Sequence, residues 1–171
     1  MSETQVASDE AESVLVEETG AGRFQVAAHA GGSTFFVDEP LAVGGLGAGP
    51  NPYDLIGAAL GACTAMTLRL YASRKAWPLA RVKVRVEHVR ATLDARDRFE
   101  RDIILEGDLD DAQRVKLLEI ANRCPVHHTL ERGSEVITVL APRAPASVTG
   151  DLVEGDQHMR HMQEACDQTP R

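Results

Sequence analysis

Short apolar runs separated by glycine-containing turns lie in the first part of the chain. Residues 13–18, 23–29 and 33–38 are interpreted as β-strands, and glycine-containing turns separate them. Residues 40–50 are rich in glycine and bounded by prolines, a pattern typical of a loop. This first part of the chain therefore predicts an antiparallel meander followed by a loop.

A long apolar run then predicts a helix. Asn51 is a good N-cap, Pro52 costs no hydrogen bond at the first helical position, and Pro78 ends the run. Apolar residues lie on every face of this helix, so we expect it to be enclosed on all sides. A single small domain cannot easily cover such a helix, and a dimer is expected.

The second half of the chain alternates between strand and helix patterns. The predicted elements are strands over 82–92 and 99–105, a helix over 110–122, a short helix from 124 toward 130, a strand over 134–140 and a possible short helix over 158–166. The class is α+β with a mostly antiparallel sheet. We expect a disordered tail over 1–12, one folded domain over 13–141 and a flexible tail over 142–171.

Composition narrows the function classes. Hydrophobic residues make up 43% of the chain and aromatic residues 4%, so the core must be aliphatic. The net charge of −8 argues against general nucleic-acid binding, because an acidic surface repels phosphate. The first residues contain no secretory signal, and the uncharged apolar stretch Leu55–Leu68 is too short to span a bilayer. We expect a cytoplasmic protein without a membrane partner.

The cysteines are the candidate reactive groups. Three widely spaced thiols fit a reducing compartment, where cysteines are buried, catalytic or metal-binding. Cys63, midway along the apolar helix, is either a small core residue or a thiolate, which would need a cation or hydrogen-bond donors nearby. Cys124 begins a short helix, whose N-terminus lowers a thiol pKa, or is simply a small terminal residue. Cys166 in the polar tail is interpreted as an exposed, incidental thiol.

A metal site is the alternative for one of these residues. Cys124 with His127 and His128 has a Cys-x-x-His spacing that zinc can use. The pattern lacks a second ligand pair, so solvated or packed histidines are the favoured interpretation. We expect no metal and no other cofactor.

Two segments resemble a known family. Residues 49–68, GPNPYDLIGAALGACTAMTL, and residues 118–127, LEIANRCPVH, resemble the signatures of the OsmC/organic hydroperoxide resistance (OsmC/Ohr) family of thiol peroxidases. The resemblance covers roughly residues 13–141, which would be an OsmC-like domain, and is closest to the OsmC-like branch.

The resemblance implies a fold and a chemistry. The fold is an intertwined homodimer with an antiparallel sheet wrapped around a long central helix. Cys63 would be the peroxidatic cysteine, attacking organic hydroperoxides or hydrogen peroxide, and Cys124 would resolve its sulfenic acid to a disulfide. A dithiol such as a lipoyl group, or a small thiol, would act as reductant.

The chain departs from the family at the groups that activate the thiolate. The family uses an Arg from the N-terminal region, for which Arg23 is the candidate. It orients that Arg with a Glu directly after the Asn-Pro of the first motif, where this chain has Tyr53; Asp54 and Glu39 are the candidate substitutes. The alternative hypothesis is an OsmC-fold redox-sensing or small-molecule-binding protein with little peroxidase activity.

Overall fold

The computed structural model describes residues 13–140 and 157–168, which belong to two compact units. The first unit runs up to Asn51 and also takes in the segment from Val139 to Gln157. The second comprises Pro52–Thr138 and the chain from His158 onward. Each unit is described by itself below.

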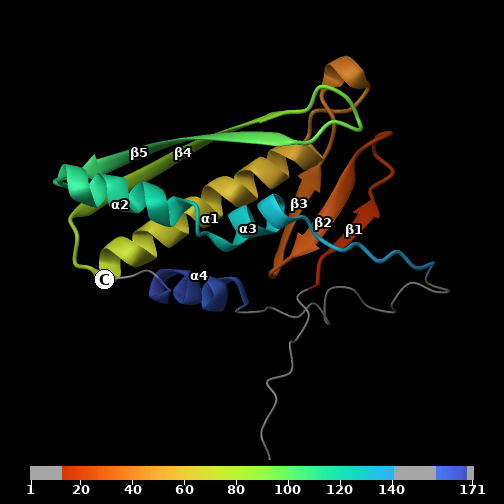
Figure 1. Ribbon diagram of the computed structural model, residues 1–171. Coiled ribbons are helices and arrows are strands. Elements are labelled where there is room, and N and C mark those ends of the chain that lie inside the picture. The colour runs from red at the N-terminus through yellow and green to blue at the C-terminus, as the bar shows by residue number, and fades with distance from the viewer. Residues whose placement is uncertain (1–12, 141–156, 169–171) are drawn as a thin grey trace, which may run out of the picture. The chain divides into compact units, whose positions relative to one another are not determined.

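The first unit is built on the predicted meander. β1 (Leu15–Glu18), β2 (Val26–Ala30) and β3 (Ser33–Val37) form an antiparallel sheet in the order β1-β2-β3 (Figure 1). In its register, Leu15 lies opposite His29. The prediction of three strands in this part of the chain is confirmed.

One buried carboxylate organises the loop that follows. Asp38 is buried and accepts backbone N–H bonds from Glu39 (2.8 Å), Leu46 (3.1 Å) and Ala48 (3.3 Å). A Cβ at Gly45 would lie 1.8 Å from the Glu39 carbonyl oxygen, so only glycine fits there. The loop, with a 3₁₀ turn at its start (η1, Leu41–Val43), is therefore held in one shape.

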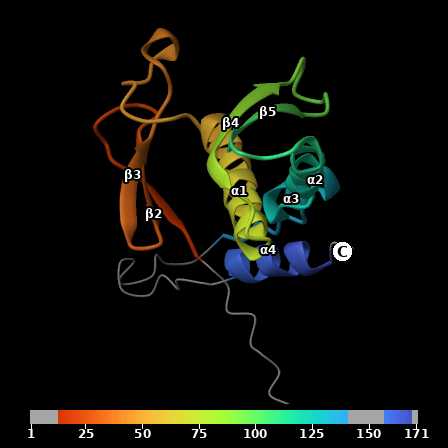
Figure 2. The ribbon, with the colours of Figure 1, turned by 90° about the vertical axis from the view of Figure 1, so that its left-hand side faces the viewer.

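The second unit is built around α1 (Pro52–Arg74). The strands β4 (Leu79–Val89) and β5 (Arg98–Gly107) form an antiparallel hairpin, and α1 packs against β4. α2 (Asp111–Ala121) and α3 (Pro125–Arg132) pack against α1 as well, and α4 (Gln157–Asp167) ends the described chain (Figure 2). The helix predicted near 158–166 is thus present as α4, and the rest of the segment 142–156 lies outside the described residues.

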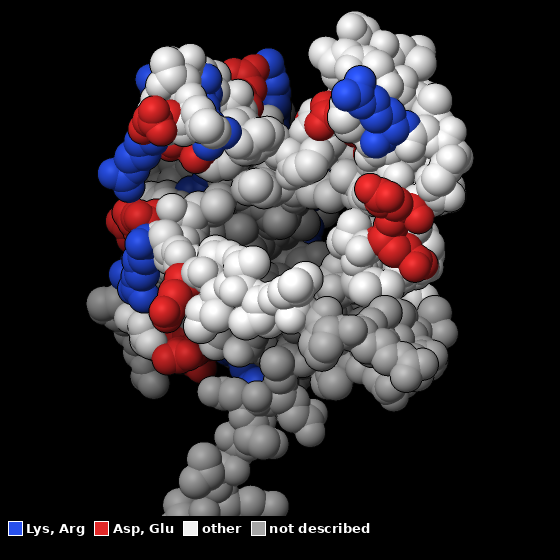
Figure 3. Space-filling view, turned by 90° about the vertical axis from the view of Figure 1, so that its right-hand side faces the viewer, with Lys and Arg blue, Asp and Glu red and all other residues white. Residues whose placement is uncertain are grey.

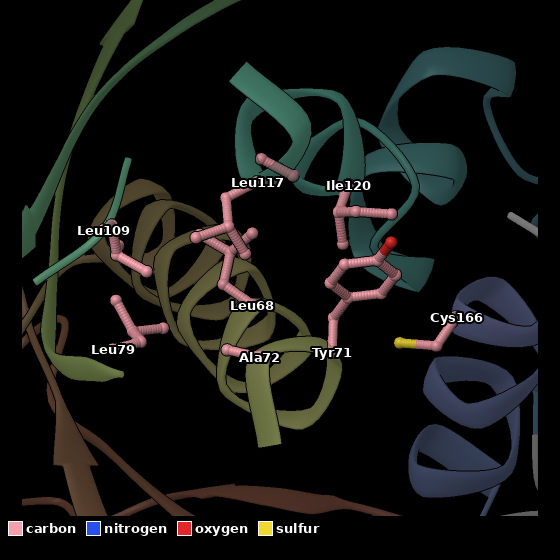
Figure 4. Packing of buried hydrophobic residues seen from close by; sticks show 9 residues of the cluster. Leu68, Tyr71, Ala72, Leu79, Leu109, Leu117, Ile120 and Cys166 are labelled. Atoms are coloured by element: carbon pink, nitrogen blue, oxygen red, sulfur yellow. The ribbon is translucent and has the colours of Figure 1, made fainter. Parts of the chain in front are cut away.

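Close packing explains the glycines of α1. A Cβ at Gly61 would lie 3.5 Å from a Val86 methyl group, and one at Gly57 would lie 3.7 Å from the same side chain. Both glycines therefore face β4, and the helix backbone lies directly on the strand. Deeper in this unit, α1, α2 and α4 share a core around Leu68, Leu117 and Ile120 (Figure 4).

Charged side chains of both signs cover the hairpin. Exposed ion pairs such as Lys83–Glu106 and Arg98–Glu100 join neighbouring residues of β4 and β5. In the space-filling view of Figure 3, Lys and Arg side chains lie beside Asp and Glu, without a broad field of one sign. Such exposed pairs contribute little to stability, because water and salt screen the charges.

One predicted strand is absent from this chain. The segment 134–140 forms no strand; its apolar side chains, from Val136 to the 98% exposed Leu140, lie open. A strand needs a neighbouring edge to bond to, and the described residues supply none here. Within one chain the central helix α1 is not covered on every side, since Ile56 and Met66 are exposed, and its enclosure by a second copy stays a prediction.

The length of α1 also corrects the prediction that the apolar stretch in this part of the chain is too short to span a bilayer. The helix is long and apolar enough to cross a membrane by length and composition, although the uncharged stretch Leu55–Leu68 is short. One such helix is weak evidence, because a core helix of a globular protein passes the same test, and α1 does contribute buried residues to the core.

Candidate active site

Cys63 lies on the buried side of α1. Its side chain is 2% exposed and packs in a small apolar cluster with Leu60 and Cys124. The half-buried residues around this cluster come from the hairpin and α3: Val86, Phe99, Val126 and Leu130. The Cys63 sulfur also accepts the backbone N–H of Val126 at 3.5 Å.

Cys124 is the N-cap of α3. Its backbone is extended (φ −63°, ψ 141°), and Pro125 fits the next position because its missing N–H would have no partner in the first turn. The Cys124 sulfur accepts the backbone N–H of His127 at 3.4 Å, as a capping side chain does. The side chain is fully buried. The helix start predicted at this position is confirmed.

The two sulfurs meet. Both cysteines are free thiols buried in one cluster, and the pKa of each responds to a hydrogen bond between the two side chains. With Cys63 as its donor, this bond raises the pKa of Cys63, and burial raises it further. The same bond lowers the pKa of Cys124, helped by the His127 N–H, the Thr64 hydroxyl and the positive charge of Arg101, against the effect of burial. The surroundings within this chain therefore favour at most one negative charge on the pair.

Arg101 is the cation of the site, and sequence analysis missed it. Its guanidinium donates to Thr64 Oγ1 (2.8 Å), the Ala121 carbonyl (3.0 Å), Asn122 Oδ1 (2.9 Å) and His127 Nδ1 (3.1 Å). The signal was available in the alternation of β5, because Arg101 occupies an inward position between the charged outward residues Glu100 and Asp102. An arginine at an inward strand position needs acceptors, and here they are neutral groups around Cys124.

The histidines do not form a metal centre in this structure. His127 Nδ1 accepts from Arg101, and burial followed by the Arg101 charge lowers the pKa of His127, which keeps the ring neutral. His128 points to Glu131, with 3.7 Å between Nδ1 and Oε2. Within residues 13–140 and 157–168, no group of three or more His, Cys, Asp or Glu side chains could hold a metal ion.

The predicted activating residues fall in different places. Arg23 and Glu39 belong to the first unit, where the Arg23 guanidinium lies over the Phe24 ring at 5.2 Å. Their role at the thiols stays a prediction. Asp54 lies in the first turn of α1, next to Tyr53.

Tyr53 belongs to an aromatic stack that reaches the cysteine cluster. Its ring stacks on His88 (4.4 Å between centroids), and His88 stacks on Phe99 (4.7 Å), which borders the cluster. The Tyr53 hydroxyl accepts from Arg90. Tyr53 is ten positions before Cys63, about 15 Å along a helix, so within this chain it contacts the stack and not the sulfurs.

Cys166 is buried, so its interpretation as an exposed thiol was wrong. It is 7% exposed and faces the core around Tyr71 and Ile120 from α4 (Figure 4). The sequence placed it in a polar tail, but the amphipathic pattern of α4 turns Met162 and Cys166 inward. Burial raises the pKa of this thiol.

Comparisons with known proteins agree with this architecture. The family model for OsmC-like proteins matches residues 45–139, which include both cysteines of the pair. A search of curated proteins found no match.

Among solved structures, an OsmC-like protein of Mycoplasma pneumoniae is similar with a TM-score of 0.61 at 17% identity, over 72% of this chain and 89% of that one. A hypothetical protein of Aquifex aeolicus has a TM-score of 0.59 at 14% identity, over 73% and 90%. The organic hydroperoxide resistance protein OsmC of Legionella pneumophila has a TM-score of 0.50 at 19% identity, over 70% and 88%. At these identities the likeness shows the fold, and the predicted fold class is confirmed.

Proposed function

Because the chain belongs to the family of OsmC-like proteins, we propose that it is a thiol-dependent peroxidase whose Cys63 and Cys124 cycle between dithiol and disulfide. The observation that carries the proposal is that two free thiols from distant parts of the sequence are buried together in one cluster. The similar protein of Legionella pneumophila is an organic hydroperoxide resistance protein, which supports the same chemistry.

The proposed cycle balances without a cofactor. The Cys63 sulfur attacks one peroxide oxygen, the O–O bond breaks, and an alcohol or water leaves while Cys63 becomes a sulfenic acid. The Cys124 sulfur then attacks the Cys63 sulfur, the S–O bond breaks, and water leaves from a disulfide. A dithiol such as a lipoyl group, or a small thiol, returns the pair to two thiols by exchange.

The cluster around the sulfurs suits an organic hydroperoxide as well as hydrogen peroxide. Apolar side chains such as Phe99 and Val126 border both cysteines. Since both sulfurs are covered in this chain, a peroxide enters when side chains around the cluster move apart. A reducing compartment such as the cytoplasm would keep both thiols free between turnovers.

The proposed active form is a homodimer. The exposed side of α1, represented by Met66, and the exposed apolar residues of segment 134–140 are surfaces that a second copy would cover. Light scattering on the purified protein tests this directly: twice the chain mass supports the dimer, and a monomer at micromolar concentration contradicts it.

Peroxide consumption tests the function. Reduced protein should consume cumene hydroperoxide or hydrogen peroxide with a dithiol present, lose two thiols per chain without it, and give a Cys63–Cys124 peptide pair in mass spectrometry. Cys63→Ser should abolish consumption. Unchanged consumption in that variant would remove Cys63 from the cycle.

Two observations favour the second candidate, a redox-sensing or small-molecule-binding protein with little peroxidase activity. The pKa of Cys63 is raised within this chain, and Tyr53, which stands in place of the family's Glu, contacts Arg90 and the aromatic stack. This candidate predicts a disulfide that forms at millimolar peroxide, with turnover near that of free cysteine.

A further inference from the structure

A cavity of about 680 Å³ lies between α3 and α4 in the second unit, where the two helices lie side by side (Figure 1). A volume of this size is typical of small-molecule sites. On α3 the lining of the cavity includes Pro125, His128 and Arg132. Val126 and Leu130, which border the cysteine cluster, lie on the opposite face of that helix. The cavity is therefore on a different side of α3 from the candidate active site.

The lining of this cavity carries more positive than negative charge. Arg123 and Arg132 contribute two guanidinium groups, while Glu164 is the one acid among the described residues that line it. His128 and His161 add two imidazole rings. The whole chain has a net charge of −8, so the cavity opposes the overall charge of the protein. A local excess of positive charge on an acidic protein suits an anionic ligand, because the rest of the surface repels anions.

The two arginines are not neutralised within the part of the chain that the structure describes. Arg123 donates to the Gln168 carbonyl at 3.2 Å, which is a neutral acceptor, and Arg132 forms no ion pair with a described Asp or Glu. On the hairpin, in contrast, Arg85 and Arg98 lie beside carboxylates. A planar guanidinium can bind a carboxylate or a phosphate group through two parallel hydrogen bonds, so both arginines are available to an oxyanion.

Neutral hydrogen-bonding groups complete the lining. Buried polar atoms usually have a partner, yet His128 Nδ1 is buried and forms no hydrogen bond within the described residues, since Glu131 Oε2 is 3.7 Å away. Thr129 and Ser134 add hydroxyl groups to the lining. Among residues 13–140 and 157–168, the acidic and histidine side chains form no group that could hold a metal ion, so the cavity suits an organic molecule better than a bare cation.

We propose that the cavity between α3 and α4 binds a small organic polyanion, with carboxylate or phosphate groups, through Arg123 and Arg132. The inference goes beyond the proposed function and does not depend on the cysteine pair. The helix α4 lies outside residues 45–139, which match the family model, so one wall of the site comes from a part of the chain that the match does not cover.

Isothermal titration calorimetry on the full reduced chain, with citrate and with pyrophosphate as separate probes, tests the inference. We expect at least one probe to bind at one site per chain with a Kd below about 1 mM in physiological salt, where diffuse charge attraction is screened. Binding of citrate alone would identify a carboxylate ligand, binding of pyrophosphate alone would identify a phosphate ligand, and binding of both would show that the site accepts either group.

Paired variants connect the binding to the cavity. Arg132→Gln should weaken binding by about tenfold, because it removes a charged hydrogen-bond donor. Glu164→Gln should strengthen binding by about threefold, because it removes a negative charge from the lining. Arg98→Gln removes an exposed arginine from β5, outside the lining, and is the control for net charge, so it should leave the Kd unchanged. A general loss of structure would not produce opposite effects in Arg132→Gln and Glu164→Gln.

Two results would overturn the inference. The first is that neither citrate nor pyrophosphate binds at millimolar concentration. The second is that Arg132→Gln and Glu164→Gln bind the probes with the same affinity as Arg98→Gln. Peroxide consumption is measured in a separate assay, so either result leaves the proposed function of the cysteine pair as it stands.

Discussion

Cys124 and Cys166 are both buried thiols near an arginine, yet their surroundings act in opposite directions. Burial raises the pKa of Cys166, and the Arg74 charge near it is compensated by Asp167, whose Oδ1 lies 2.7 Å from Arg74 Nη1. Cys124 has hydrogen-bond donors, and its Arg101 binds only neutral acceptors in the described chain. A buried thiol is thus activated by donors and by a cation whose charge is still available.

The largest expected effect comes from replacing each of the two cysteines by serine in turn. Cys124→Ser should abolish the peroxide-induced disulfide completely, because the Cys63 sulfenic acid then has no thiol beside it; a dimedone adduct on Cys63 would report it. Cys166→Ser should leave the disulfide intact. A disulfide that includes Cys166 in the wild-type chain would contradict the separation of the two sites.

The next test separates packing from reactivity. Leu117 is fully buried in the cluster that contains Cys166, so Leu117→Ala should lower the free energy of unfolding by about 2–5 kcal/mol, as measured by urea denaturation. The same variant should leave the midpoint of the first thiol ionisation, followed by thiolate absorbance at 240 nm against pH, unchanged. A shifted midpoint would mean that the two clusters do not act independently.

The pH dependence of alkylation sharpens the comparison further. The pKa of Cys124 lies below the ordinary thiol value of about 8.5 and that of Cys166 above it, so at pH 7 the thiolate fraction is larger at Cys124. Iodoacetamide labelling of the reduced protein should favour Cys124 by about tenfold or more at pH 7, and the ratio should shrink toward pH 10 as Cys166 ionises. A ratio independent of pH would indicate that access alone sets the rates.

The smallest expected effect comes from removing the carboxylate that forms an ion pair with Arg74. Asp167→Asn removes the carboxylate that compensates Arg74, so the pKa of Cys166 should fall and its labelling at pH 8 should rise. The gain should stay within about fivefold, since exposed charge pairs are worth about 1 kcal/mol or less. Asp102→Asn, which removes an exposed carboxylate near Arg85, is the matched control and should change nothing at Cys166.

The sequence predicts most of the fold because its signals are local. The cap and prolines around α1, the turns between the first three strands, the alternation of β4 and the Cys124-Pro125 helix start each depend on a few neighbouring residues. The prediction that Cys63 and Cys124 form a pair came from the family resemblance, because no local feature of either segment indicates that the two lie close together.

The features that the sequence did not predict depend on contacts between residues that are far apart in the chain. Arg101 acts through four acceptors from three other segments, and Cys166 is buried by residues far from it in sequence. Segment 134–140 has the pattern of a strand but no strand to pair with in the described chain, so the strand that the pattern predicts does not form.

The position of Cys124 at the first turn of α3 has a mechanical consequence. A bond between its sulfur and Cys63 would staple the start of α3 to the middle of α1 and close a ring that contains β4, β5 and α2. A ring of roughly 60 residues restricts the unfolded chain by about 4 kcal/mol in the loop-entropy description. The oxidised chain would then have a higher melting temperature than the reduced chain, so its thermal stability would indicate whether the two thiols have been oxidised.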